Sequence, residues 1–283
     1  MRVALVLMLM TSPAWAVEMR VARDLPYAEP KSERNTLDIY SADDGTAAVK
    51  PRRPVIVWIH GGGWRRGDKA VMDHKPQAYV DRGFVFAAIN YRFYPDVTIQ
   101  QMMGDVAKAI GWVHGHVREY GGDPERLIVM GHSAGAHLAA LVCTDERYLK
   151  FEGLPLATIK GCVPLDVAAL DIPKRMADSP DTSGNFVALF GATTEAQQQA
   201  SPVTFVAPNK NIPPFLILHI TSRRETTEQS QWFAEKLKAA GVPATVVSCE
   251  GKTHATLNSD LGQPEDAPTL AIDQFLDTVL VKK

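Results

Sequence analysis

The stretch Leu127–Leu141, LIVMGHSAGAHLAAL, joins a short apolar run, a glycine-flanked turn and a run of small and apolar residues. The apolar run is typical of a buried strand, and the residues from Ala134 onward are typical of a helix. Strand, G-x-S-x-G and helix in this order predict a tight, strained turn that exposes the hydroxyl of Ser133. The hydroxyl would then lie at the N-terminus of the helix, which favours negative charge. The motif therefore predicts that Ser133 is a nucleophile.

A second glycine run follows an earlier apolar stretch. Pro54–Ile59 is nearly all apolar, as in strands buried on both faces of a parallel sheet, and it ends in HGGGW at His60–Trp64. Glycines after a buried strand can present backbone N–H groups with no side chain in the way. Attack on a carbonyl places negative charge on its oxygen, which such donors stabilise. We predict that Gly62, Gly63 and Ala134 form this oxyanion hole.

Strand-like and helix-like segments alternate along most of the chain. This alternation predicts an α/β fold with a doubly wound, mostly parallel sheet and helices on both faces. Residues 17–283 are expected to form a single domain. Residues 171–213, rich in Pro, Ser, Thr, Gly and Gln, interrupt the alternation and are predicted to be an excursion over the edge of the sheet or a lid. The expected strands are Asn35–Tyr40, Pro54–Ile59, Phe84–Ile89, Leu127–Met130, Ile159–Leu165, Phe215–Ile220 and Ala244–Ser248, with a loop at Gly121–Pro124.

The chain has eight histidines, and the position of His254 best suits a general base for Ser133. His254 lies just after the last expected strand, which leaves room for an acid in the chain order nucleophile, acid, histidine. His219, at the end of the preceding expected strand, is the alternative. His60 is expected to hold the glycine loop, and His132 is expected to point away from the site.

A carboxylate that orients the histidine is expected in the loop after His219. Glu225 is the only acidic residue there before the next expected helix. Either Glu or Asp can accept the N–H of an imidazole. We therefore predict Glu225 as the orienting acid, with Asp166 and Asp171, after the preceding strand, as alternatives.

The chain resembles carboxylesterases of the α/β-hydrolase fold. The likeness rests on HGGGW at His60–Trp64 and GHSAGAHLA at Gly131–Ala139, and it covers nearly all of the chain after residue 16. The second motif is also similar to that of arylformamidases, whereas hormone-sensitive-lipase-like esterases usually have GDSAGG there. In most relatives an Asp occupies the position of Arg223. The resemblance implies Ser133 as nucleophile and His254 as base.

Three functions are compatible with these residues. The first is a serine carboxylester hydrolase that acts on small or aryl esters through an acyl-enzyme, with no metal and no cofactor. An arylformamidase-like amide hydrolase would use the same groups. A non-catalytic binding protein with a hydrolase fold is the third, and Arg223 in place of the usual acid motivates it.

Composition excludes several other classes. The 283 residues carry a formal net charge of -2, and no basic stripe indicates nucleic-acid binding. No later apolar run is long enough to span a membrane. The three cysteines Cys143, Cys162 and Cys249 match no metal-binding spacing and are expected to be buried, with one disulfide left open.

The N-terminus has the pattern of a secretory signal peptide. Residues 1–16 combine Arg2, a short apolar core and an A-x-A ending at Ala14–Ala16. We expect cleavage near Val17 and export to the bacterial periplasm or the medium.

Overall fold

One eight-stranded sheet organises the computed structural model, which describes residues 16–29, 32–43, 51–178 and 183–281. Its strands are β1 (Met19–Pro26), β2 (Thr36–Ala42), β3 (Arg53–Ile59), β4 (Val85–Ile89), β5 (Gly122–His132), β6 (Ile159–Leu165), β7 (Phe215–Ile220) and β8 (Ala244–Cys249). They lie in the order β1-β2-β4-β3-β5-β6-β7-β8. β2 is antiparallel to both β1 and β4, and all other neighbours are parallel.

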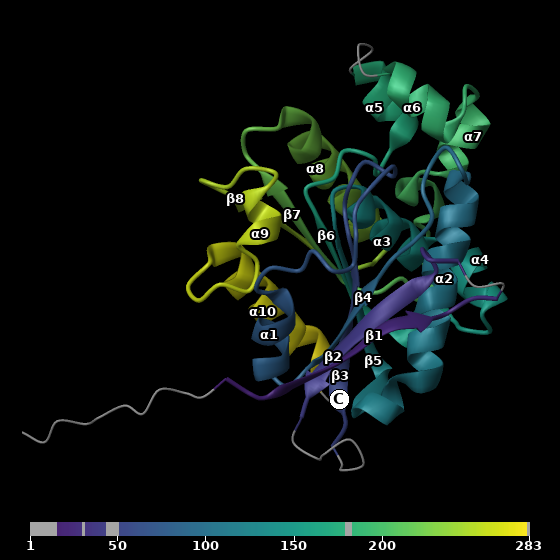
Figure 1. Cartoon of the computed structure of the whole chain (residues 1–283). Helices are drawn as coiled ribbons and strands as arrows, with labels where there is room; N and C mark the ends of the chain where they lie inside the picture. The colour runs from purple at the N-terminus through teal and green to yellow at the C-terminus, as the bar shows by residue number, and fades with distance from the viewer. Residues whose placement is uncertain (1–15, 30–31, 44–50, 179–182, 282–283) are drawn as a thin grey trace, which may run out of the picture.

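Helices cover both faces of the sheet (Figure 1). They are α1 (Lys75–Asp81), α2 (Ile99–His116), α3 (Ala134–Thr144), α4 (Glu146–Phe151), α5 (Ile172–Asp178), α6 (Ser183–Phe190), α7 (Thr194–Gln199), α8 (Arg224–Ala239), α9 (Thr256–Ser259) and α10 (Ala267–Leu280). The cluster of buried residues on one face includes side chains of α1 and α10, and the cluster on the other includes side chains of α2, α3 and α8. The predicted doubly wound α/β fold is confirmed.

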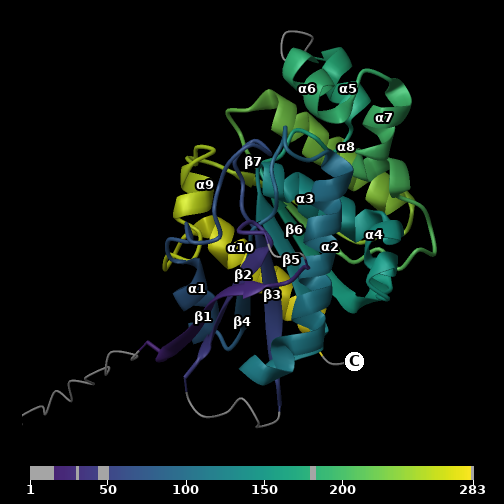
Figure 2. The same cartoon turned by 45° about the vertical axis from the view of Figure 1, so that its right-hand side comes forward.

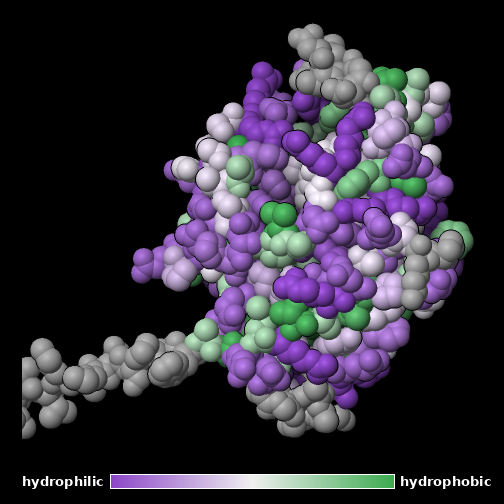
Figure 3. Space-filling view, in the orientation of Figure 1, coloured by the Kyte–Doolittle hydropathy of each residue, from purple (hydrophilic) through white to green (hydrophobic). Residues whose placement is uncertain are grey.

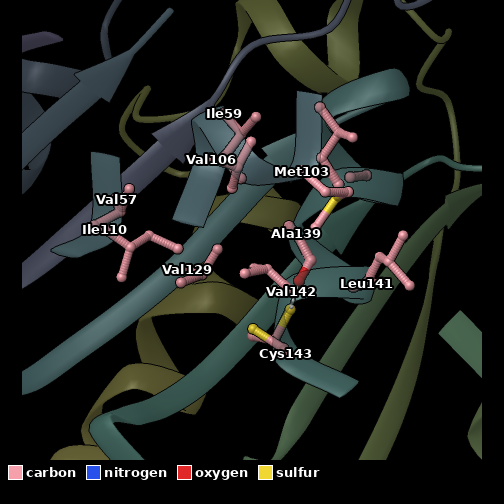
Figure 4. Packing of buried hydrophobic residues seen from close by; sticks show 14 of the residues in the cluster. Val57, Ile59, Met103, Val106, Ile110, Val129, Ala139, Leu141, Val142 and Cys143 are labelled. Atoms are coloured by element: carbon pink, nitrogen blue, oxygen red, sulfur yellow. Dashed lines mark hydrogen bonds between the residues drawn. The ribbon is translucent and has the colours of Figure 1, made fainter. Parts of the chain in front are cut away.

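Strand β3 is buried on both faces because its alternate residues enter different cores. Val57 and Ile59 join the cluster with α2 and α3, whereas Ile56 and Trp58 join the one with α1 and α10. Figure 4 shows Val57 and Ile59 among side chains of α2 and α3. Burying an aliphatic side chain of this kind contributes about 1.5–3 kcal/mol, so an all-apolar sequence is what this position requires.

Two expectations at the sheet differ from the structure. Gly121–Pro124 was expected to be a loop, but β5 already begins at Gly122, which pairs with Arg53 of β3. A Cβ at Gly122 would lie 2.4 Å from a methyl group of Val117, so this glycine allows the preceding turn to pack tightly on the strand. β1 was not expected, because it is a half-exposed edge strand with little apolar signal.

The segment of residues 171–213 contains three short α-helices, α5, α6 and α7, and a 3₁₀ helix at Pro202–Phe205 among its described residues. Figures 1 and 2 both show α5, α6 and α7 grouped together at one end of the molecule. The ring of Phe186 lies 6.2 Å and that of Phe190 lies 5.2 Å from the ring of Trp64, measured between centroids. The segment therefore contacts the glycine loop, and its role as a lid stays a prediction.

The surface, the N-terminus and the cysteines were also the subject of predictions from the sequence. None of the described helices is long and apolar enough to cross a membrane. On the face shown in Figure 3, hydrophobic residues form separate small patches among hydrophilic ones. Residues 1–15 of the expected signal peptide lie outside the described residues. All three cysteines are buried and free, so the disulfide left open by the sequence is not formed here.

Candidate active site

Ser133 lies in the turn between β5 and α3 with a strained backbone, φ +56° and ψ −120°. A non-glycine residue held in such a conformation costs about 1–3 kcal/mol, which the surrounding contacts must offset. Its N–H donates to Leu165 O at 2.9 Å. A Cβ on Gly135 would lie 2.1 Å from Ile59 O, and one on Gly131 would lie 2.4 Å from Gly135 O. Both glycines of G-x-S-x-G are therefore needed for close backbone approach.

His254, Ser133 and Asp166 form a hydrogen-bonded row. His254 Nε2 lies 3.0 Å from Ser133 Oγ, and its Nδ1 lies 2.6 Å from Asp166 Oδ2. Because an ionised carboxylate only accepts, Nδ1 carries the proton and donates it to Asp166. Nε2 is then free to accept from the serine hydroxyl. This is the arrangement that activates a serine for attack.

Asp166 is held as an anion by its surroundings. It is 1% exposed and directly follows β6. Its Oδ1 accepts from Ile220 N at 3.3 Å, and its Oδ2 accepts from Arg223 Nη1 at 2.9 Å. Burial alone would raise the pKa of Asp166, but hydrogen bonds from His254 and Thr226 and the positive charge of Arg223 lower it to about 2. The carboxylate is therefore ionised at neutral pH.

The prediction that Glu225 contacts the histidine is wrong. Glu225 Oε1 accepts from Arg223 Nε at 3.2 Å, so the arginine lies between this carboxylate and the site. Asp171, the other alternative, accepts from Trp232 Nε1 at 3.0 Å. A residue after β6 can take the place of the acid expected after β7, because β6 and β7 are neighbours and their C-terminal ends lie side by side. The signal for Asp166 was its place directly after an apolar strand.

The glycine loop presents unpaired N–H groups. Gly62 has φ +125° and Gly63 has φ +63°, values that favour glycine. Gly62 O accepts from Arg65 N and Arg66 N, both at 3.2 Å, which closes a tight turn. Within the described residues, the N–H groups of Gly62, Gly63 and Ala134 donate to no protein acceptor. They are therefore available to an oxygen bound at Ser133.

Comparison with known proteins agrees with this geometry. The sequence profile of the BD-FAE family matches residues 37–237. The chain belongs to the BD-FAE family.

Three proteins with similar sequences or structures illustrate the kinship of this BD-FAE family chain. A probable isoprenylcysteine alpha-carbonyl methylesterase of Arabidopsis thaliana is 32% identical over 84% of this chain and 51% of its own. LipM, a probable carboxylic ester hydrolase of Mycobacterium tuberculosis, is 29% identical over 90% of this chain and 61% of its own. The structure of inhibited esterase B from Lactobacillus rhamnosis superposes with a TM-score of 0.77 at 19% identity, covering 93% of this chain and 87% of that one.

These comparisons confirm the α/β-hydrolase fold and the resemblance to carboxylesterases. The chain spans about half the length of four curated relatives that it matches, between 51% and 58% of theirs.

His132 has a place in the site that sequence reasoning missed. It was expected to point away, but its ring lies 4.4 Å from that of His254 between centroids. Burial lowers the pKa of His132 to about 3, so the ring is neutral, and Nε2–H donates to His254 O at 2.8 Å. His132 thus holds both the backbone and the ring of the proposed base. The signal available in the sequence was a polar residue directly before Ser133.

Two further buried histidines hold the glycine loop. His60 Nδ1 donates to Gly61 O at 2.7 Å, as expected from the sequence. His137 was missed: its Nδ1 accepts from Trp64 Nε1 at 3.2 Å, and its Nε2 donates to Ala200 O at 2.7 Å. Burial lowers the pKa of each ring to about 4, so both are neutral at pH 7. His60 therefore holds the start of the loop at Gly61, and His137 of α3 holds its end at Trp64.

His219, the alternative base, is not at the site. It is 3% exposed, and its Nδ1 lies 2.9 Å from Thr227 Oγ1 on α8. Among the described residues no cluster of His, Cys, Asp and Glu has the arrangement of a metal site. The open part of the site is a cavity of about 800 Å³, lined by the glycine loop, Ser133, His254 and residues of the following turn.

Proposed function

We propose that this chain is a serine carboxylester hydrolase that works through an acyl-enzyme. The observation that carries the proposal is the hydrogen-bonded row from Asp166 through His254 to Ser133, at 2.6 and 3.0 Å. The names of its relatives support ester hydrolysis, since both the methylesterase and the carboxylic ester hydrolase act on esters by name. Small or aryl esters are the substrates that we propose.

In the first half of the reaction, Ser133 Oγ attacks the ester carbonyl while His254 Nε2 takes the hydroxyl proton. The resulting imidazolium is stabilised by the ionised Asp166. The N–H groups of Gly62, Gly63 and Ala134 donate to the oxyanion. The tetrahedral intermediate then collapses, the C–O bond to the alcohol breaks, and the alcohol leaves with the proton from His254.

In the second half, water replaces the alcohol. His254 Nε2 takes a proton from the water as its oxygen attacks the acyl carbon. Collapse of the second intermediate breaks the bond to Ser133 Oγ, which regains the proton from His254. The acid is released, and the site returns to its starting state.

The first experiment compares hydrolysis of p-nitrophenyl acetate by the wild type and by Ser133→Ala. Removing the nucleophile from such a site typically costs about 10⁴- to 10⁶-fold in rate. Equal rates in the two proteins would show that Ser133 is not the nucleophile. An inactive wild type across acetyl to octanoyl esters would favour the formamide or the binding alternative, and turnover of formylkynurenine separates those two.

We also propose export to the periplasm or the medium. The support is the charged, apolar and A-x-A pattern of residues 1–16. Expression in a bacterial host followed by fractionation and N-terminal sequencing tests it. The expected product lies outside the cytoplasm and begins near Val17, whereas a cytoplasmic product that keeps Arg2 would contradict the proposal.

A further inference from the structure

The turn that follows the oxyanion glycines brings two arginines into the cavity of the proposed active site. Arg65 and Arg66 line this cavity together with Ser133 and His254. The N–H groups of both arginines donate to Gly62 O, so their backbones lie next to the proposed oxyanion donors. Both residues are exposed. A substrate carbonyl held at Ser133 therefore has two cations within its surroundings.

Neither guanidinium has a carboxylate partner among the described residues. The Arg65 guanidinium lies over the ring of Tyr94, with its central carbon 4.5 Å from the ring centroid, and this contact holds the group in place without supplying a counter-ion. Asp68, which also lines the cavity, pairs with Arg34 at 2.9 Å and with Asn90 at 3.1 Å. The cavity thus has an excess of positive charge at this wall.

The other two arginines near the site are neutralised. Arg34 pairs with Asp68, and Arg223 pairs with Asp166 and Glu225. A positive wall in a concave site raises the local concentration of anions and their rate of association. Guanidinium groups also bind carboxylates through paired hydrogen bonds. The excess charge at this wall therefore suits the binding of an anionic group.

We propose that the site prefers esters that carry a second, ionised carboxyl group, such as the half-esters of dicarboxylic acids. This inference rests on the proposed function. The ester carbonyl lies at Ser133, and the free carboxylate is held by Arg65 and Arg66. Val71, an exposed aliphatic residue of the same cavity, provides an apolar wall for the chain that joins the two groups.

The test compares monoethyl glutarate with its neutral isostere, in which the free carboxyl group is a primary amide. The wild type is expected to prefer the anionic ester by about five- to ten-fold in kcat/KM, mainly through KM, because exposed charge pairs are individually weak. In the double variant Arg65→Gln/Arg66→Gln this ratio is expected to fall to about one. Raising the salt concentration should reduce the wild-type ratio in the same direction.

The control variant Arg118→Gln/Lys150→Gln removes the same charge from exposed residues that do not line the cavity, and it should keep the wild-type ratio. A wild type that hydrolyses both esters equally, or a preference that survives in the arginine variant, would overturn the inference and leave the esterase proposal intact. A loss of preference in the control as well would assign the effect to net charge and also overturn it. No turnover of either ester, nor of p-nitrophenyl acetate, would instead count against the esterase proposal.

Discussion

The two sides of His254 are built in different ways. On one side, the Ser133 turn and the glycine loop are held by backbone atoms at very short range, as at Gly135, where a Cβ would lie 2.1 Å from Ile59 O. On the other side, the carboxylate is a single side chain, Asp166, at the end of one of two neighbouring strands. The first side requires glycine at fixed positions. On the second side, a carboxylate from more than one loop could fill the role.

This difference explains what could be predicted. Close backbone contact demands glycine at fixed spacing, so Ser133, Gly62 and Gly63 stand out in the sequence. A carboxylate needs only to reach His254 Nδ1, and the ends of β6 and β7 both lie within reach.

Asp166→Asn is expected to reduce kcat/KM for p-nitrophenyl acetate by about 10³- to 10⁴-fold. An amide can donate to Nδ1 and so favours the wrong tautomer of His254. Esterase kinetics with a folding check by circular dichroism measure the effect. Asp171→Asn is the matched control, because Asp171 accepts from Trp232 rather than from the histidine. A larger loss in Asp171→Asn would contradict the assignment.

Gly135→Ala tests the Ser133 side of His254, where close contact between backbone atoms requires glycine. The new methyl group would collide with Ile59 O and with His60 O, at 2.1 and 2.5 Å from its position. Overpacking against backbone typically costs about 1–3 kcal/mol or more in the free energy of unfolding. Urea unfolding measures it. Gly104→Ala in α2 is the control, because its Cβ would meet nothing within 4 Å, and there alanine should stabilise the helix by about 1 kcal/mol.

Lowering the pH should reduce the free energy of unfolding first through the buried histidines and then, at lower pH, through Asp166. His60, His132 and His137 are buried and neutral, with pKa values of about 4, 3 and 4, whereas they titrate near 6.5 when unfolded. The unfolded chain therefore binds more protons below pH 6.5, and stability falls as the pH drops from 6.5 toward 4. Asp166, with a pKa of about 2, adds a loss only below pH 4. We expect the urea midpoint to fall between pH 7 and pH 5; an unchanged midpoint would show that these rings are not buried as neutral groups.

His132→Phe should lower kcat/KM by about ten-fold, because the aromatic contact with His254 remains but the donor to His254 O is lost. Misplacing a catalytic group by a fraction of an ångström has effects of this order. His132→Gln retains a donor and is expected to recover part of the rate. Equal rates in both variants would show that the hydrogen bond at 2.8 Å does not position the base.

Glu225→Gln is the smallest effect that we predict, less than about three-fold in kcat/KM. The side chain contacts Arg223 and not His254, and Arg223 keeps its bond to Asp166 at 2.9 Å. The pair is partly exposed to solvent, and ion pairs near the surface typically contribute about 0–1 kcal/mol. A loss as large as that in Asp166→Asn would restore Glu225 as the orienting acid.

A similar contrast holds in the rest of the fold, where only some elements could be predicted from the sequence. The periodicity of apolar residues predicted most of the sheet, because strands such as β3 are buried on both faces. It missed β1, which is half exposed, and the α-helices within residues 171–213, which are only six to eight residues long. His132 and His137 were missed because their roles depend on contacts with residues far away in the chain, His254 and Ala200.

Ser133 and His254 are separated by 121 residues, and β8, the strand before His254, lies at one end of the sheet. The two groups therefore meet only after the strands between them have assembled, and such long-range contacts form slowly. During synthesis, the residues of the Ser133 turn are made before His254, the proposed base. Ester hydrolysis in a refolding experiment should thus recover no earlier than the signal of β8 docking, which makes activity a reporter of the last stage of assembly.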